Sequence, residues 1–167
     1  MVNVQKTVLD GITLELRVLL NLAKVNVLDI ETDDTYIKVT SAAPFGIKLI
    51  EDLKQSFLHT DMIDLINAHQ LIFVEGGKLH IHYNWVFIFQ KVYWALNKFG
   101  KHPMACTITN DTLYFKFSRR RNTMDFDQLM IIQDFINPGR MLTDNLFVIG
   151  MNEDYTMYVK LDKGRAA

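Results

Sequence analysis

Three consecutive arginines, Arg119, Arg120 and Arg121, form the sharpest charge feature of the sequence. Lys116 precedes the run by three positions, at the end of a segment whose pattern is typical of a β-hairpin. A guanidinium group can bind phosphate oxygens or a guanine edge with two hydrogen bonds at once, so the run predicts contact with nucleic acid. Two alternatives remain open: a solvated loop paired with the neighbouring acids Asp125 and Asp127, or contact with an acidic protein surface.

Tyrosine and lysine recur on one side of the predicted strands. Because successive strand residues point to opposite faces of a sheet, period-two alternation places these side chains toward solvent. The row consists of Tyr36, Lys38, Tyr114, Lys116, Tyr158 and Lys160, joined by His80 and His82. Phenol rings stack on bases and ammonium groups neutralise phosphates, which indicates DNA or RNA as partner. Two alternatives stay open: Tyr and Lys are simply well tolerated on a solvent-facing strand, or the face contacts a protein partner.

Residue types that could support catalysis or metal binding do not form a recognisable site. His80 and His82 could face one metal ion, but no sequence neighbour supplies the third ligand that zinc needs. Asp33 and Asp34 match the composition of a turn. Cys106, the single cysteine, is predicted to be an ordinary strand residue whose side chain packs in the core. Without a phosphate-binding glycine loop or a Ser-His-Asp arrangement, we predict no enzymatic activity, no cofactor and no metal.

Hydrophobic periodicity predicts an α+β fold in which about four β-hairpins alternate with helices that pack on one face of an antiparallel sheet. A helix is expected over residues 7–24, and hairpins over 27–40, 71–83, 104–118 and 146–161. Further helices are expected over residues 44–57, with Pro44 in the first turn, and over residues 61–69, 85–99 and 123–136. Asn84 is the expected N-cap of the helix over residues 85–99, and Gly100 its expected end.

Two segments of the sequence resemble each other at an offset of 78 positions. The hexapeptide that begins at Tyr36 aligns with the strand that begins at Tyr114, and similar Thr, Asn and Asp residues form the turn before each. We therefore predict a single domain over residues 1–167 with a pseudo-two-fold repeat, its halves spanning about 26–99 and 104–162 after the opening helix.

The predicted helix over residues 85–99 is apolar almost all round. Such a helix lies at the centre of a fold or at an interface. In the second case Trp85, Phe89 and Trp94 would contact a protein partner or a second copy of the chain, since aromatic side chains dominate binding energies.

Net charge is distributed unevenly along the 167 residues. The formal total is −1, yet residues 1–75 carry 11 acids and 6 bases, whereas residues 76–167 carry 8 acids and 12 bases. A polyanion should therefore favour the second half. No apolar run is long enough to span a membrane, and the N-terminus has no secretory signal pattern, so we expect a cytoplasmic protein without a membrane partner.

The segment from Leu71 to Ile81, the helix that follows it and the segment from Cys106 to Lys116 together resemble the C-terminal double-wing DNA-binding domain of the phage transcription factor MotA. The resemblance covers under a third of the chain and rests on layout, so it assigns no role to an individual residue. It implies hairpins alternating with helices, DNA binding and a phage protein that acts in an infected host cell. The leading hypothesis is a nucleic-acid-binding regulatory protein; the alternative is an interaction module or inhibitor that docks on a host protein through the aromatic helix or an acidic surface.

Overall fold

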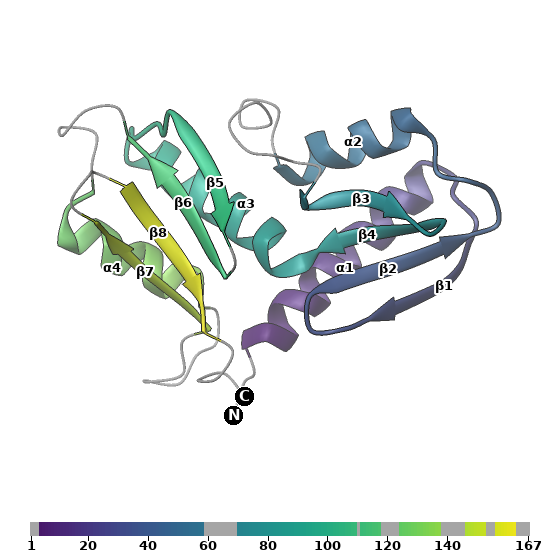
Figure 1. Ribbon diagram of the computed structural model, residues 1–167, viewed down its shortest axis with the longest axis horizontal. Helices are drawn as coiled ribbons and strands as arrows, with labels where there is room; N and C mark the ends of the chain where they lie inside the picture. Colours follow the sequence, from purple (N-terminus) through teal and green to yellow (C-terminus); the bar gives the residue numbers. More distant parts are fainter. Residues whose placement is uncertain are drawn as a thin grey trace. The chain divides into compact units, whose positions relative to one another are not determined.

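The computed structural model describes residues 4–58, 70–109, 111–117, 124–137, 146–152 and 156–162. The fold is α+β, as predicted, with helices and strands alternating along the chain (Figure 1). In chain order the elements are α1 (Val4–Leu22), β1 (Val27–Thr32), β2 (Tyr36–Ser41), α2 (Ile47–Leu58), β3 (Ile72–Glu75), β4 (Lys78–His82), α3 (Tyr83–Lys98), β5 (Ala105–Thr109), β6 (Thr112–Lys116), α4 (Phe126–Phe135), β7 (Phe147–Met151) and β8 (Thr156–Leu161).

The chain divides into two compact units. One spans residues 8–87, and the other spans residues 88–167 together with the first seven residues, so the division falls inside α3. The expected single domain over residues 1–167 stays a prediction.

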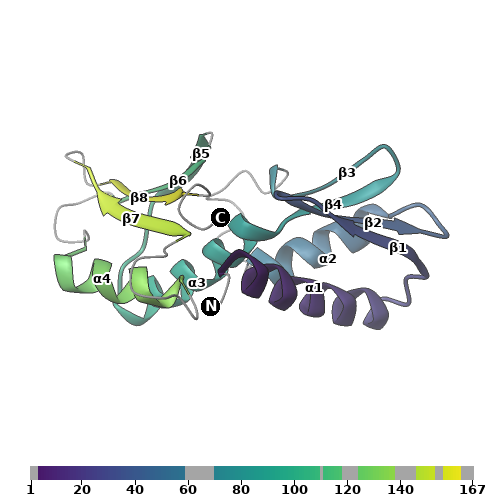
Figure 2. The ribbon, with the colours of Figure 1, turned by 90° about the horizontal axis from the view of Figure 1, so that it is seen from below.

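In the unit of residues 8–87, strands β1 to β4 form an antiparallel sheet in the order β1-β2-β4-β3, here called sheet A. Helices α1 and α2 cover one face of it (Figure 2). That face is apolar because every second residue of the central strands is hydrophobic: Ile37, Val39, Leu79 and Ile81 are all fully buried. Helix α1 contributes Val8, Ile12, Leu16 and Leu20, whose four-residue spacing places them along one side of the helix.

The turns of sheet A follow from local chemistry. Gly76 and Gly77 connect β3 to β4 with φ angles of 59° and 75°, a left-handed conformation that glycine adopts without steric cost. Between β1 and β2, the Asp33 carboxylate accepts hydrogen bonds from the backbone N–H groups of Thr35 (2.8 Å) and Tyr36 (2.7 Å). Asp33 is therefore a turn residue, as its sequence context predicts.

In the unit of residues 88–167, strands β5 to β8 form a second antiparallel sheet in the order β5-β6-β8-β7, here called sheet B. Helix α4 and the part of α3 within this unit cover one face (Figure 2). Leu113, Phe115, Met157 and Val159 point into this apolar layer and are fully buried. Helix α4 begins at Phe126 rather than at Thr123, because Asp125 and Gln128 form a capping box there.

Two details of the predicted architecture are corrected. Among the described residues the hairpins form two four-stranded sheets instead of one, because β2 pairs with β4 and β6 pairs with β8. Asn84 is not the N-cap of α3: the helix begins one residue earlier, and the Nδ1 atom of His82 accepts the hydrogen bond from the Trp85 N–H instead. Asn84 is buried, and its side-chain amide has no hydrogen-bond partner within the described residues.

The order α-β-β-α-β-β occurs twice in the chain, and both sheets have the same relative strand order. Strand β5 begins 78 positions after β1, which is the offset found in the sequence. That the two halves derive from one repeated segment stays a prediction. The helix expected over residues 61–69 lies outside the described residues.

Candidate nucleic-acid interface

The residues predicted to bind nucleic acid divide between the two sheets. In each sheet they alternate with the buried residues that face the helices, so they lie on the opposite face, here called the open face. Sheet A contains Tyr36, Lys38, His80 and His82; sheet B contains Tyr114, Lys116, Tyr158 and Lys160. Arg119, Arg120 and Arg121 lie outside the described residues. Because the two sheets belong to different units, each open face is considered by itself.

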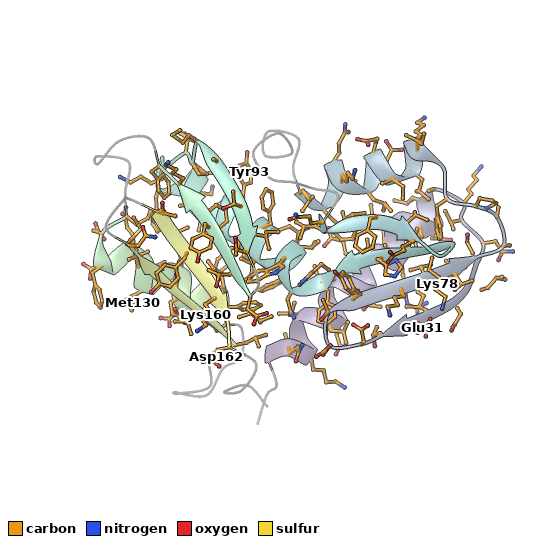
Figure 3. All side chains as sticks on the ribbon, viewed as in Figure 1. Glu31, Lys78, Tyr93, Met130, Lys160 and Asp162 are labelled. Carbon is orange, nitrogen blue, oxygen red and sulfur yellow. The ribbon has the colours of Figure 1, made fainter. Side chains whose placement is uncertain are left out.

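Acidic side chains accompany both lysines of sheet A. Lys38 forms an ion pair with Asp33 at 3.1 Å, and Lys78 reaches across β2 to bind Glu31 (Figure 3). The hydrogen bond and charge of Lys78 lower the pKa of Glu31, and Glu31 in turn raises the pKa of Lys78. Strands β1 and β3 add Asp29 and Glu75. Acids thus outnumber lysines on these strands, which disfavours binding of a polyanion.

The rings on the open face of sheet A pack against one another. His80 stacks on Phe73 with a centroid distance of 4.8 Å, and Tyr36 meets both rings edge-on. His82 stacks on Trp85 at 5.9 Å. His80 is consequently only 9% exposed, although its strand position predicted a solvent-facing side chain. Phe73 is not among the residues predicted from the sequence, although the alternation of β3 places it beside His80.

Sheet B has a different set of side chains on its open face. Tyr114 and Tyr158 are direct partners in the pairing of the central strands β6 and β8. Lys116 and Lys160 are exposed on the same face, and neither forms an ion pair with a residue in the described ranges. Figure 3 labels Lys160. Between the first and last residues given above, strands β5 to β8 contain no Asp or Glu. Asp111 precedes β6 and Asp162 follows β8.

Glycine at position 150 allows Tyr158 to lie close to strand β7. A Cβ atom at Gly150 would lie 2.5 Å from the Tyr158 hydroxyl oxygen, 2.6 Å from Cζ and 2.9 Å from Cε1. The outer end of the ring therefore rests directly over the glycine, which is a known way to cover a glycine in an edge strand. Gly150 is not among the residues predicted from the sequence, because its position opposite Tyr158 depends on strand pairing.

Of the three aromatic residues predicted to contact a protein partner, only Trp94 is accessible. Trp85 and Phe89 are buried, at 2% and 0% exposed, whereas Trp94 is 53% exposed. Its indole ring packs on Phe135 of α4 at a centroid distance of 5.2 Å, and the Lys98 ammonium lies 5.4 Å from the indole ring centre. The burial of Trp85 and Phe89 reflects the central position that an all-apolar helix can take.

The histidine, cysteine and acidic side chains of the described residues are the candidate metal-binding and nucleophilic groups. No set of three or more His, Cys, Asp or Glu side chains among the described residues could hold a metal ion. Cys106 is 5% exposed, and burial raises the pKa of its thiol to about 12, which keeps it protonated. Among the described helices, none is long and apolar enough to cross a membrane.

Comparison with protein-family models, with curated proteins and with solved structures finds no match.

Proposed function

We propose that the protein binds nucleic acid through the open face of sheet B. The observation that supports this best is the set of side chains on β6 and β8: two adjacent tyrosines and two lysines without acidic partners among the described residues, on strands that lack acids. Lysine side chains neutralise phosphates and release counterions, and tyrosine rings offer stacking surfaces for bases. Sheet A, whose lysines are ion-paired, is the less suitable face.

The arginine run adds to this proposal through its place in the sequence. Arg119 follows the last residue of β6 by three positions, so the run is connected to the strand that contains Tyr114 and Lys116. Replacing all three arginines by alanine should lower the affinity for nucleic acid and reduce the dependence of that affinity on salt concentration. A regulatory role, which the resemblance to the double-wing domain implies, remains part of the proposal.

The decisive experiment measures binding of labelled DNA and RNA oligonucleotides by fluorescence anisotropy over a range of salt concentrations. We expect the double variant Lys116→Ala, Lys160→Ala to bind more weakly and to lose about 0.7–0.9 of the log–log salt slope for each phosphate contact removed. The matched control is Lys38→Ala, Lys78→Ala, which removes the same charge from sheet A and should have the smaller effect. Absence of salt-dependent binding by the unmodified protein at low salt would refute the proposal.

Exposure of Trp94 supports a second candidate function, docking on another protein. Large exposed aromatic side chains anchor many protein interfaces. The discriminating experiment is affinity capture after nuclease treatment, with Trp94→Ala compared against Phe126→Ala, a similarly exposed aromatic on α4. A partner that survives nuclease, is lost with Trp94→Ala and is retained with Phe126→Ala would favour docking over nucleic-acid binding.

A further inference from the structure

We infer that the ligand of the open face of sheet B is a single-stranded nucleic acid whose bases stack on Tyr114 and Tyr158. This inference rests on the proposed function and specifies its ligand. It starts from the position of the two tyrosines on the two central strands, directly opposite each other. Directly paired residues have Cβ atoms about 4.5–5.5 Å apart, so the two rings start from neighbouring positions on the open face, with the Tyr158 ring directed over Gly150 of β7.

The width of the sheet argues against a duplex. Four strands at spacings of roughly 4.8 Å place the outer strand axes about 14 Å apart, and side chains add to that width. The major groove of B-DNA is about 12 Å wide and admits a helix or a two-stranded ribbon, and the minor groove is narrower. Strands β5 and β7 would therefore meet the duplex backbone before Tyr114 or Tyr158 reached a base. A single strand has unpaired bases and can lie across the whole face.

The lysines flank the tyrosine pair on both sides. Lys116 lies two residues beyond Tyr114 on β6, and Lys160 lies two residues beyond Tyr158 on β8. Because these strands run antiparallel, the two lysines lie at opposite ends of the pair, in rows about 13 Å apart. A chain of nucleotides running along the strands would meet an ammonium group before and after the stacked bases. Along the strand direction the order is therefore one ammonium group, the row that holds both tyrosines, and the second ammonium group.

The Tyr158 ring is also held in place before any ligand arrives. Its outer end rests on Gly150, so one side is already in contact with strand β7, and its exposure is intermediate. An immobilised ring loses little conformational entropy when a base stacks on it, which favours binding. Gly150 is thus a positioning residue for the stacking surface.

The experiment compares one labelled sequence as single-stranded DNA, single-stranded RNA and duplex DNA, at fixed low salt, by fluorescence anisotropy. We expect both single strands to bind more tightly than the duplex. Tyr114→Ala should weaken single-strand binding roughly 5- to 150-fold, the effect of losing one stacked base. Tyr114→Phe and Tyr158→Phe should bind nearly as well as the unmodified protein, since a phenyl ring also stacks. The matched control is Tyr36→Ala on sheet A, which should leave the affinities for the single strands and for the duplex unchanged.

The remaining outcomes separate this inference from the function on which it rests. One outcome would overturn the inference and leave nucleic-acid binding intact. In it the duplex binds as tightly as the single strands, Tyr114→Ala has no effect, and the double variant Lys116→Ala, Lys160→Ala binds more weakly. Absence of binding to all three probes would overturn both. Near-UV circular dichroism of each variant verifies that its fold is retained, and a Tyr114→Ala variant that fails this test is replaced by Tyr114→Leu, which removes the aromatic ring but keeps an apolar side chain.

Discussion

The Nδ1 atom of His82 accepts a hydrogen bond of 3.3 Å from the backbone N–H of Trp85, and the imidazole and indole rings stack. His82 therefore serves as the N-cap of α3 and at the same time orders a ring next to it. Histidine is an unusual cap, since Ser, Thr, Asp and Asn are preferred at this position. The stacking contact with Trp85 is what distinguishes it from those residues.

Replacing His82 by alanine should lower the free energy of unfolding by about 1–3 kcal/mol, because the cap and the aromatic contact are both lost. His82→Asn should recover part of this, since asparagine can cap but cannot stack. Urea unfolding followed by tryptophan fluorescence measures the effect, with His102→Ala, an exposed histidine, as control. Equal stability of His82→Ala and the unmodified protein would show that the 3.3 Å contact does not contribute.

Gly150→Ala tests the support beneath Tyr158. The new Cβ atom would lie within 2.5–2.9 Å of the ring, so the ring must move away from β7. We expect a loss of stability of about 1–3 kcal/mol from this overpacking and, in addition, weaker binding of single-stranded oligonucleotides although Tyr158 itself is unchanged. Thermal unfolding and anisotropy measure the two effects. An unaltered affinity with a measurably displaced ring would remove Gly150 from the binding surface.

Local features of the sequence predicted most of the elements correctly. Gly76, Gly77 and Gly100 all have the positive φ angles that their turn and helix-end positions require. Alternation along β2 and β6 identified the buried and open faces, because a strand with one buried face repeats every two residues. These features depend on neighbours in the chain, so the sequence alone defines them.

Features that depend on distant segments were not predictable in the same way. The same four hairpins are compatible with one sheet or two, and only the pairing of β2 with β4 and β6 with β8 decides between them. His80 has the strand position of a solvent-facing residue, yet Phe73 from β3 and Tyr36 from β2 cover it. For the candidate site, the sequence indicated the tyrosines and lysines of sheet B but not the ion pairs that distinguish sheet A from it.

Asp33 should make the stability of sheet A depend on acidic pH. Burial acts to raise the pKa of its carboxyl group, but hydrogen bonds from Tyr36, Thr35 and Lys38 outweigh it, so the pKa lies below its ordinary value. The ionised form is therefore the one that stabilises the fold. Its contribution is complete above the unfolded-state pKa of about 3.9 and is lost as the pH falls through the lower folded-state value.

Asp33→Asn should accordingly destabilise the protein at neutral pH, and the difference from the unmodified protein should shrink as the pH falls below about 4. Urea unfolding at a series of pH values measures this difference. Asp34→Asn is the matched control, because it removes the same charge but leaves intact the two hydrogen bonds that Asp33 accepts from Thr35 and Tyr36. A difference that stays constant down to pH 2 would contradict the assignment.

The side-chain amides of Gln133 and Asn137 close the outer edge of sheet B. Gln133 donates to the Phe147 carbonyl at 2.6 Å and accepts from the Ile149 N–H at 2.8 Å. Asn137 accepts from the Phe147 N–H at 2.9 Å and donates to the carbonyl of the same residue. The two amides, both buried, thus pair backbone groups of β7 on the edge that faces no other described strand.

Gln133→Ala or Asn137→Ala should each lower the free energy of unfolding by about 1–3 kcal/mol, because buried backbone groups of β7 lose their partners. The amide protons of Phe147 and Ile149 should also exchange faster with solvent, which hydrogen exchange followed by NMR resolves residue by residue. Asn97→Ala, an exposed amide on α3, should change neither quantity. Since β7 also contains Gly150, loosening this edge should weaken single-strand binding as well. Unchanged hydrogen-exchange rates at Phe147 and Ile149 in both variants would show that the two amides do not hold β7 in place.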